Sequence, residues 1–230
     1  MKTISPNRTS FLKGSRAVLP LLIGVFPFGM IYGVLAMDAG IPPIAAQSMS
    51  WLLFAGAAQF IATPLIHNAV PALVILMIIA VVNLRHVLYS ASLAPFVKTL
   101  SLRWKVLLSY LMVDEAYAIV IRHYNDEGVT PASHWYFLGA GLTLWSTWQI
   151  STGVGILLGA TLPPNWPLDF ALPLTFIAII MPAIKDRPSI AAALSAGTVA
   201  VLAYNAPYKL GLMLAAMTGI LVGAILEARK

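Results

Sequence analysis

Long stretches without a charged side chain constrain this chain more than any other feature. The longest runs from Ala39 to Leu84, 46 residues without Asp, Glu, Lys or Arg, and it follows a shorter run from Ala17 to Met37. An α-helix rises 1.5 Å per residue, so about 20 apolar residues cross the hydrocarbon core of a bilayer. The shorter run therefore predicts one membrane-spanning helix, and the longer run is too long for a single crossing.

Composition excludes the soluble alternatives. Hydrophobic residues make up 60% of the 230-residue chain and charged residues 10%, with a mean hydropathy of +0.86. A soluble domain carries about 25% charged residues, and a disordered chain is poor in apolar ones. A membrane β-barrel would show alternating segments of about 10 residues, whereas these runs are unbroken. The predicted fold class is therefore all-α, a polytopic helical membrane protein.

Breaks in the apolar pattern divide the chain into about seven or eight membrane segments. Pro64 and the stretch from Ile66 to Pro71 divide the longest run. The predicted segments are 17–37, 44–64, 71–97, 106–121, 135–160, 169–184, 188–206 and 208–226. They form one predicted transmembrane domain, 17–226, between a basic N-terminus, 1–16, and a short tail, 227–230.

Lysine and arginine predict the orientation, because they gather on the cytoplasmic side of membrane proteins. Four basic residues and no acid precede position 17, so we expect a cytoplasmic N-terminus. Basic residues at 98–105, 185–187 and 229–230 also favour the cytoplasm. The polar segment 122–134, with two acids and one Arg, is predicted to be an external aqueous loop.

These assignments conflict with the number of segments. Three segments lie between the N-terminus and Lys98, where an even number of crossings is required, and two lie between 134 and 185, where an odd number is required. We therefore expect at least one segment in each half to be re-entrant, broken or not a crossing. Irregular segments in corresponding halves are typical of inverted repeats, although the sequence shows no clear repeat.

Three ionisable side chains interrupt the apolar segments: Arg85, Asp114 and Glu115. An ionised side chain at the centre of a membrane helix costs about 2.5–3.5 kcal/mol, so the three would cost on the order of 8–10 kcal/mol if deep and unpaired. The net stability of a domain is only about 5–15 kcal/mol. The fold must therefore pair these groups, hydrate them or place them near an interface.

Arg85 lies in the first polar cluster. In a helix, Arg85 and Tyr89 are i,i+4 neighbours, and His86 falls beside Tyr89 on the face shared by two further polar residues, Asn83 and Ser90. A guanidinium presents a planar fork that suits a carboxylate. Two interpretations stay open: a site for a substrate carboxylate, or a basic residue that snorkels to the membrane surface with Tyr89 in the aromatic belt.

Asp114 and Glu115 form the second cluster. Adjacent residues on a helix point about 100° apart, so the two carboxylates cannot face one partner equally. One of them could simply pair with Arg85 and hold two helices together. The functional alternative is a site for a substrate ammonium, or a proton carrier.

A third cluster repeats at the helical positions i, i+3, i+4 and i+7: Trp145, Trp148, Gln149 and Thr152. Its face is aromatic and polar, which suits either a cavity lining or tight helix packing through hydroxyl groups. Helix breakers form a fourth signal, at Pro27 with Gly29, within Phe54–Phe60, and at Pro182 and Pro207. In lipid such breaks are tolerated where protein, water or ligand satisfies the freed backbone groups. They indicate either a substrate site on discontinuous helices or close contacts between small residues.

The sequence contains no motif that indicates an enzyme or a cofactor site. The sequence lacks the His-Glu-x-x-His, Gly-x-Ser-x-Gly and P-loop motifs. It has no cysteine, which excludes disulfides, iron–sulfur clusters and thiolate metal sites, and its four histidines are scattered. The net charge of +6 follows segment ends rather than a nucleic-acid stripe. We therefore expect no enzyme activity, metal, cofactor or nucleic-acid partner.

Five short motifs occur in order along the chain: Pro27 to Gly33, Phe54 to Phe60, Asn83 to Tyr89, Asp114 to Ala118, and Trp145 to Trp148. Together with a later stretch from Met181 to Ala183, they resemble the AzlC family, the large subunit of branched-chain amino acid permeases. The resemblance covers about residues 15–187. Each motif is unspecific alone, but the ordered set of five is fairly specific.

This resemblance implies efflux of leucine, isoleucine, valine or their analogues by a two-component secondary carrier of the bacterial inner membrane. The usual partner in the family is a small AzlD-type membrane subunit. Two alternatives stay open. The chain could transport, or form a channel for, another small polar solute, or it could be a packing subunit whose partner carries the substrate path.

The residue roles are our own hypothesis. Arg85 would bind or balance the substrate carboxylate, and Asp114 or Glu115 would bind the ammonium or carry a coupling proton. A zwitterion needs both charges matched, and an aliphatic side chain needs dry contacts. The polar contacts would come from Gln59 and the broken backbone at Gly29 and Gly56, and the apolar pocket from Phe28, Trp145 and Trp148. The remaining candidates are Asn83, His86, Tyr89 and Gln149.

Overall fold

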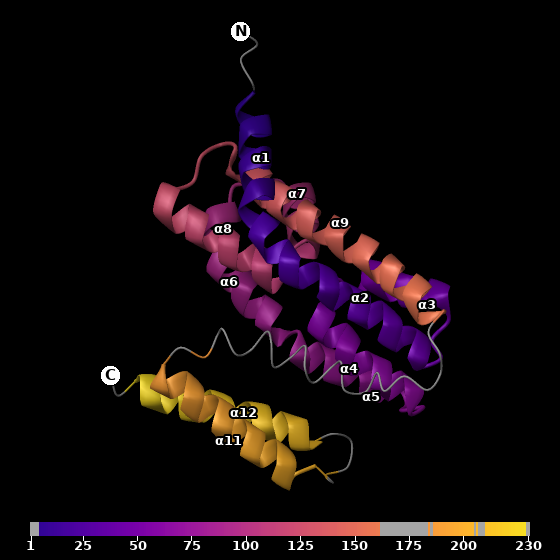
Figure 1. The fold of residues 1–230 in the computed structure, drawn as a ribbon. Helices are drawn as coiled ribbons and strands as arrows, with labels where there is room; N and C mark the ends of the chain where they lie inside the picture. Colours follow the sequence, from indigo (N-terminus) through magenta and orange to yellow (C-terminus); the bar gives the residue numbers. More distant parts are fainter. Residues whose placement is uncertain (1–4, 162–183, 185, 205, 207–209, 229–230) are drawn as a thin grey trace. The chain divides into compact units, whose positions relative to one another are not determined.

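The computed structural model describes residues 5–161, 184, 186–204, 206 and 210–228. They belong to two units, Met1–Leu168 and Asp169–Lys230, which are described separately. Every regular element among the described residues is a helix (Figure 1). Two helical stretches, Pro6–Asp38 and Ala72–Val97, are long and apolar enough to cross a membrane. The all-α membrane fold class is confirmed.

Three long helical rods frame the first unit. The first joins α1 (Pro6–Val18), the single 3-10 turn η1 (Leu19–Leu21) and α2 (Leu22–Asp38); the second joins α5 (Ala72–Val82) and α6 (Leu84–Val97); the third is α9 (Ser133–Gly159). Their 33, 26 and 27 residues correspond to about 50, 39 and 40 Å of helix. Each rod therefore exceeds the thickness of a hydrocarbon core.

Glycines let the first rod lie directly against α9 (Figure 1). A β-carbon built on Gly33 would lie only 2.5 Å from the carbonyl oxygen of Thr152, and one built on Gly155 would overlap the backbone of Met30. Membrane helices associate through such close backbone packing, because lipid offers no hydrophobic drive between them. Glycine is therefore required at these positions for contact with the facing helix.

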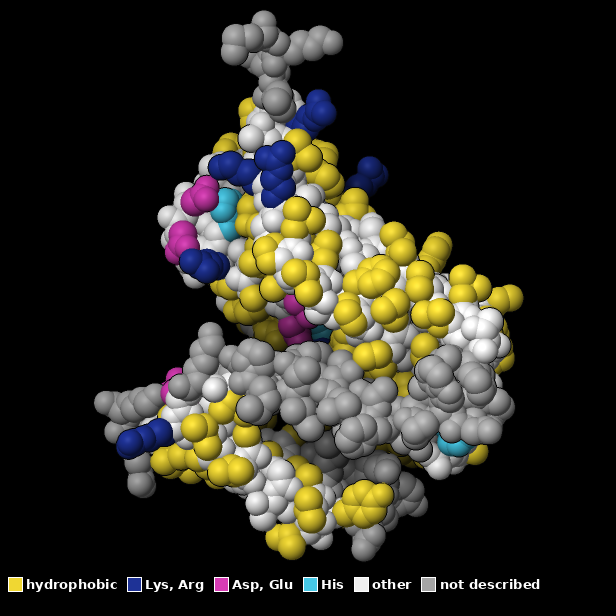
Figure 2. Space-filling view, in the orientation of Figure 1, with side chains coloured by type: hydrophobic (Ala, Val, Ile, Leu, Met, Phe, Trp, Pro, Cys, Tyr) yellow, Lys and Arg dark blue, Asp and Glu magenta, His cyan; other side chains and the backbone are white. Residues whose placement is uncertain are grey.

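Basic residues mark one end of the rods. Seven of the eight basic residues described in the first unit gather toward this basic end: Arg8, Lys13, Arg16, Lys98, Arg103, Lys105 and Arg122. Lys13 Nζ lies 3.8 Å from Glu127 Oε2, which brings the start of α1 beside the end of α8. Figure 2 shows dark blue side chains near that end, with hydrophobic side chains below them. At the opposite end, His67 Nδ1 lies 3.2 Å from the carbonyl oxygen of Ala39.

Two hairpins fill the space between the rods. Each joins two short helices across an extended break: hairpin 1 is α3 (Pro43–Leu52), residues 53–55 and α4 (Gly56–His67), and hairpin 2 is α7 (Leu102–Tyr110), residues 111–113 and α8 (Asp114–Glu127). Helices of 9 to 14 residues are about 14–21 Å long. None of the four can cross a membrane alone.

Hairpin 1 enters the bundle from the opposite end and returns to it. Its first helix reaches the middle of α9, where the rings of Trp51 and Trp145 lie 6.0 Å apart. Its second helix ends at His67, which contacts the carbonyl of Ala39 at the end of α2. The segment predicted at 44–64 is therefore not one continuous helix but a hairpin that starts and ends at the same end of the bundle.

Hairpin 2 enters from the basic end and returns there. Near its start, the rings of Trp104 and His134 lie 4.5 Å apart, beside the first turn of α9. Tyr110 reaches the middle of α9, where its hydroxyl accepts a hydrogen bond from Trp145. The second helix ends at Glu127, again at the basic end. The two hairpins thus enter the bundle from opposite ends.

Between the N-terminus and Lys98 this arrangement leaves two long helical rods, the even number required, and it corrects two expectations. The part of the conflict between 134 and 185 involves residues outside the described part of the chain. The N-terminus and segment 122–134 lie at the same end, because Lys13 contacts Glu127, so the segment cannot be external if the N-terminus is cytoplasmic. Nor is 122–134 a loop: α8 continues to Glu127, and only residues 128–132 separate it from α9. The polar sequence is a solvated helix end, stabilised in part by i,i+4 pairs such as Arg122 with Asp126.

The predicted break around Gly29 is also wrong. Helix α2 runs through Pro27 and Gly29 without interruption. A proline removes only one hydrogen bond, and the φ angle it imposes is helical, so close packing against α9 can hold the helix together. Gly29 serves that packing, because a β-carbon there would overlap the Ser151 hydroxyl.

Among its described residues, the second unit contains two packed helices, α11 (Arg187–Leu202) and α12 (Leu210–Glu227). Asp186 caps α11 by accepting a hydrogen bond of 3.0 Å from the backbone N–H of Ser189. A β-carbon on Gly219 would lie 3.0 Å from the Ala196 side chain, so small residues line the contact. The predicted segment 169–184, apart from residue 184, and the residues Pro182 and Pro207 lie outside the described residues.

Candidate functional site

The break in hairpin 2 places two acids at a helix N-terminus. Val113 is extended (φ −116°, ψ 171°), and Asp114 and Glu115 form the first turn of α8. Leu111, just before, packs on Gly141 of α9, where a β-carbon would lie only 2.8 Å from the leucine Cβ. A helix N-terminus carries a partial positive charge and free N–H groups, so it stabilises carboxylates there. This explains how the fold accommodates acids halfway through the bundle.

Arg85 lies at a second break. Asn83 separates α5 from α6 with ψ near 0°, and Arg85 is the second residue of α6. A cation at a helix N-terminus is unfavourable by itself. Arg85 Nη1 donates to Asp114 Oδ2, which joins the two breaks through an ion pair. The side chains are 28% and 41% exposed, so the pair is only partly shielded.

Several polar atoms around the Arg85–Asp114 pair have unused hydrogen-bonding capacity. Among the described residues, Asn83 Oδ1, Arg85 Nε and Asp114 Oδ1 are buried and have no hydrogen-bond partner, and Glu115 makes no ion pair. An unsatisfied buried polar group costs about 1–3 kcal/mol. Three such atoms on neighbouring side chains therefore favour a ligand or water that completes their hydrogen bonds.

Aromatic rings flank the charged cluster on α6 and α8. The rings of Tyr89 and Tyr117 stack at 4.3 Å, and His86 meets Tyr89 edge-on at 5.9 Å. The Tyr117 hydroxyl donates to Ser92 Oγ at 3.0 Å. The structure thus brings together the predicted residues of the first two clusters and adds Tyr117, which the sequence analysis did not single out.

The break in hairpin 1 is neutral. Gln59 donates from Nε2 to Ser50 Oγ at 2.9 Å and accepts at Oε1 from Trp148 Nε1 at 3.0 Å. Ser50 Oγ also lies 3.0 Å from Thr152 Oγ1. Gln59, Ser50 and Thr152 are fully buried. This polar network satisfies its own groups and ties hairpin 1 to α9.

Aromatic side chains pack around this network. Phe28 stacks on Phe60 at 4.3 Å and meets Trp148 at 5.8 Å, and the ring of Tyr32 stacks over Trp148 at 6.3 Å. Gly56 is required here, because a β-carbon would lie 2.8 Å from the Trp148 ring. Tyr32 and Phe60 lie within two of the family motifs, Pro27 to Gly33 and Phe54 to Phe60, but the sequence analysis did not name them as candidate site residues.

Trp145 does not join Phe28 and Trp148. It lies instead between the tips of the two hairpins, the tip being the part of each hairpin around its break. Its ring is 6.0 Å from that of Trp51, and its Nε1 donates to the Tyr110 hydroxyl at 2.8 Å. Residues three apart on a helix differ by about 60° in direction, which is enough to face different neighbours. Gln149 likewise turns to hairpin 1: its Oε1 accepts a hydrogen bond of 2.8 Å from Gln47.

Apart from Trp145, the candidate residues therefore form two groups. One is the charged cluster of Asn83, Arg85, His86, Tyr89, Asp114 and Glu115; the other is the neutral core of Phe28, Gly29, Gly56, Gln59, Trp148 and Gln149. In the part of the chain that the structure describes, no hydrogen bond or ion pair joins the two groups. The same part contains no cluster of three or more potential metal ligands.

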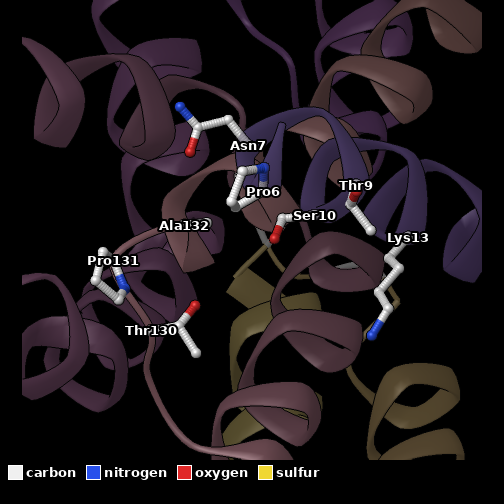
Figure 3. Close-up of a pocket in the computed structure, with 8 residues that line it drawn as sticks. All are labelled: Pro6, Asn7, Thr9, Ser10, Lys13, Thr130, Pro131 and Ala132. Carbon is white, nitrogen blue, oxygen red and sulfur yellow. The ribbon is translucent and has the colours of Figure 1, made fainter. Parts of the chain in front are cut away.

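A surface groove of about 600 Å³ lies at the basic end, between the start of α1 and the 128–132 turn (Figure 3). Its lining is mostly small or short: Pro6, Asn7, Thr9, Ser10, Lys13, Thr130, Pro131 and Ala132. The one charged side chain, Lys13, also faces Glu127. The groove therefore lacks the convergent charges that the cluster around Arg85 provides.

Comparison with known proteins decides the family. The model of the AzlC family, described as AzlC protein, matches residues 20–162, which include all three breaks and the charged cluster. The chain belongs to the AzlC family. No solved structure matches it.

Two relatives that match over most of their length are named as membrane proteins, and a third, matched over part of its length, is named as a transport protein. A membrane protein of Archaeoglobus fulgidus is 29% identical over 217 residues, 92% of this chain and 93% of the relative. The inner membrane protein YgaZ of Escherichia coli is 24% identical over 96% of this chain and 91% of its own length. The branched-chain amino acid transport protein AzlC of Bacillus subtilis is 26% identical over 71% and 63%. The family and these relatives support a role in membrane transport.

Proposed function

We propose that this AzlC-family chain is the large subunit of a two-component secondary transporter that exports branched-chain amino acids. The charged cluster carries the proposal. Arg85, Asp114 and Glu115 meet at two helix breaks, halfway along an otherwise apolar bundle, and neighbouring buried atoms lack partners among the described residues. Ionisable groups at such depth are costly and mark substrate or ion pathways.

The chemistry of the cluster suits a zwitterion. A substrate carboxylate would bind to Arg85, whose Nε has no partner among the described residues, and a substrate ammonium would bind to Asp114 or Glu115. Separation of the Arg85–Asp114 pair would expose both charges at once. Tyr89 and Tyr117 add apolar surface beside them, which suits an aliphatic side chain. The name of the Bacillus subtilis relative supports the branched-chain class.

The basic end is the proposed cytoplasmic side. Seven basic residues and two acids, Asp126 and Glu127, gather there, and the positive-inside rule assigns that side to the cytoplasm. The N-terminus and the 128–132 turn would both be cytoplasmic, in a bacterial inner membrane, as the name of the Escherichia coli relative suggests. Glu115, without an ion pair in the described part of the chain, is the proposed proton carrier.

Reconstitution tests this proposal. The chain is inserted into vesicles with and without a small AzlD-type subunit, and efflux of labelled leucine, isoleucine, valine and unrelated solutes is measured. We expect branched-chain efflux that requires the small subunit. Movement of unrelated solutes alone would contradict the branched-chain assignment and favour a transporter or channel for another small polar solute.

One observation favours a second function. The direct ion pair between Arg85 and Asp114 would also be expected if it only linked α6 to α8. The chain would then be a packing subunit, and its partner would carry the substrate path. In that case the pair should matter for assembly but not for transport by correctly assembled complexes. Apolar replacement of the pair, described below, separates the two functions.

A further inference from the structure

Tyr110 stands where the two hairpins meet. It is the last residue of α7, and its hydroxyl donates to the carbonyl oxygen of Trp51, in the last turn of α3, at 2.6 Å. The same hydroxyl accepts from Trp145 Nε1 at 2.8 Å. The described residues contain no other hydrogen bond between hairpin 1 and hairpin 2.

The bond has a clear physical basis. The last carbonyls of a helix lack partners within the helix, and the break after α3 leaves that of Trp51 free. Trp51 and Tyr110 are 57% and 41% exposed, so the bond lies at the surface of the bundle, where lipid would offer a free carbonyl no other partner. Tyr110 supplies the donor from the other hairpin, and the ring of Phe54, 6.5 Å from that of Tyr110, packs beside it.

In secondary transporters, one packed part of the protein rocks against another as a rigid body, and this opens the substrate site alternately to each side. A hydroxyl that bonds to both the opposite tip and α9 resists independent movement of either tip. We propose that Tyr110 is a positioning residue that ties the two hairpin tips together, so that hairpin 1 and hairpin 2 move as one unit during transport. This inference rests on the proposed transport function but not on the identity of the substrate.

Hydrogen exchange in lipid nanodiscs tests the link, using the full chain with its small subunit. Tyr110→Phe removes the hydroxyl and keeps the ring. We expect faster exchange in two peptides, 51–58 and 108–114, by about threefold, the effect of one average hydrogen bond between membrane helices. Trp145→Phe leaves the bond to Trp51 intact and should have a smaller effect on 51–58.

Tyr117→Phe is the matched control, because it removes a tyrosine hydroxyl that bonds to Ser92 and not to hairpin 1. It should leave exchange in 51–58 unchanged. If Tyr110→Phe speeds exchange only in 108–114, or in neither peptide, the two tips are not coupled and the proposal is overturned. Because exchange is measured without substrate, this result is distinguishable from failure of the proposed transport function.

Discussion

The breaks of the two hairpins differ in how their polar groups are satisfied. At the break of hairpin 1, Gln59, Ser50 and Trp148 satisfy one another in a neutral network with almost no exposure. At the break of hairpin 2, the Arg85–Asp114 pair is partly exposed and leaves atoms without partners in the described part of the chain. Similar backbone breaks thus carry different chemistry: the neutral one fixes the hairpin to α9, and the charged one keeps capacity for a ligand.

Replacement of the charged pair should have the largest effect. Arg85→Met alone strands a carboxylate in the bundle, at a cost of about 2.5–3.5 kcal/mol if it stays ionised. Arg85→Met with Asp114→Leu removes both charges, and paired apolar replacement is often neutral for stability. We expect the double variant to regain thermal stability but to transport at least about 10-fold more slowly, because the substrate loses hydrogen bonds to charged groups, which contribute about 1.5–3 kcal/mol.

Efflux assays on assembled complexes, together with thermal unfolding, check this outcome. Full transport by the double variant would show that the pair is a structural link, and hairpin 2 would then resemble hairpin 1.

Glu115→Gln should uncouple transport from protons. Efflux by the unmodified protein should respond to an imposed pH gradient with the membrane potential clamped, and the variant should lose this response. Asp126→Asn is the control, since it neutralises an exposed acid near the other end of the same helix. A response that survives in Glu115→Gln would exclude Glu115 as the carrier, and no response in the unmodified protein would exclude proton coupling.

Gln59→Leu should lower stability rather than alter substrate choice. The change leaves Trp148 Nε1 buried without its acceptor, and such a group costs about 1–3 kcal/mol. Thermal unfolding measures the loss, and the ratio of leucine to valine efflux should stay the same. Gln47→Leu, in a partly buried pair with Gln149, is the matched control and should cost less. A changed substrate ratio in Gln59→Leu would place hairpin 1 in the substrate site.

Lys13→Ala should have the smallest effect. The Lys13–Glu127 pair anchors the outer end of hairpin 2 to α1, but the two side chains are 61% and 60% exposed. Exposed ion pairs contribute about 0–1 kcal/mol and weaken further with salt. We expect a stability change of at most about 0.5 kcal/mol, smaller at high salt. A larger loss would mean that hairpin 2 depends on its outer anchor rather than on its tip.

The sequence predicted those parts of the fold that follow from charge and composition. Intramembrane charges at 85, 114 and 115, the break within Phe54–Phe60 and the need for re-entrant segments were all visible in it. The break at 111–113 was not, because Leu111-Met112-Val113 contains neither glycine nor proline. It is imposed by tertiary contact, through the packing of Leu111 on Gly141 and the pairing of Asp114 with Arg85.

The candidate site was predictable in its residue types but not in its grouping. Helical periodicity places Trp145 and Trp148 on one broad face of α9. In the structure, however, Trp145 bonds to Tyr110 of hairpin 2, and Trp148 bonds to Gln59 of hairpin 1. Similarly, the number of charges in 122–134 suggested an external segment. Only the structure shows that Glu127 pairs with Lys13 and so lies at the same end as the N-terminus. Direction around a helix and the side of the membrane depend on packing partners that are far away in the sequence.

Opposed hairpins are the central claim, and labelling tests it most directly. The chain has no cysteine, so single cysteines can be placed at Thr9, Val129 and Asn68 without other changes. A membrane-impermeant maleimide is applied to vesicles of both orientations. Thr9→Cys and Val129→Cys should react from the same side, and Asn68→Cys from the other. Reaction of Thr9→Cys and Val129→Cys from opposite sides would show that hairpin 2 crosses the membrane and would contradict the account.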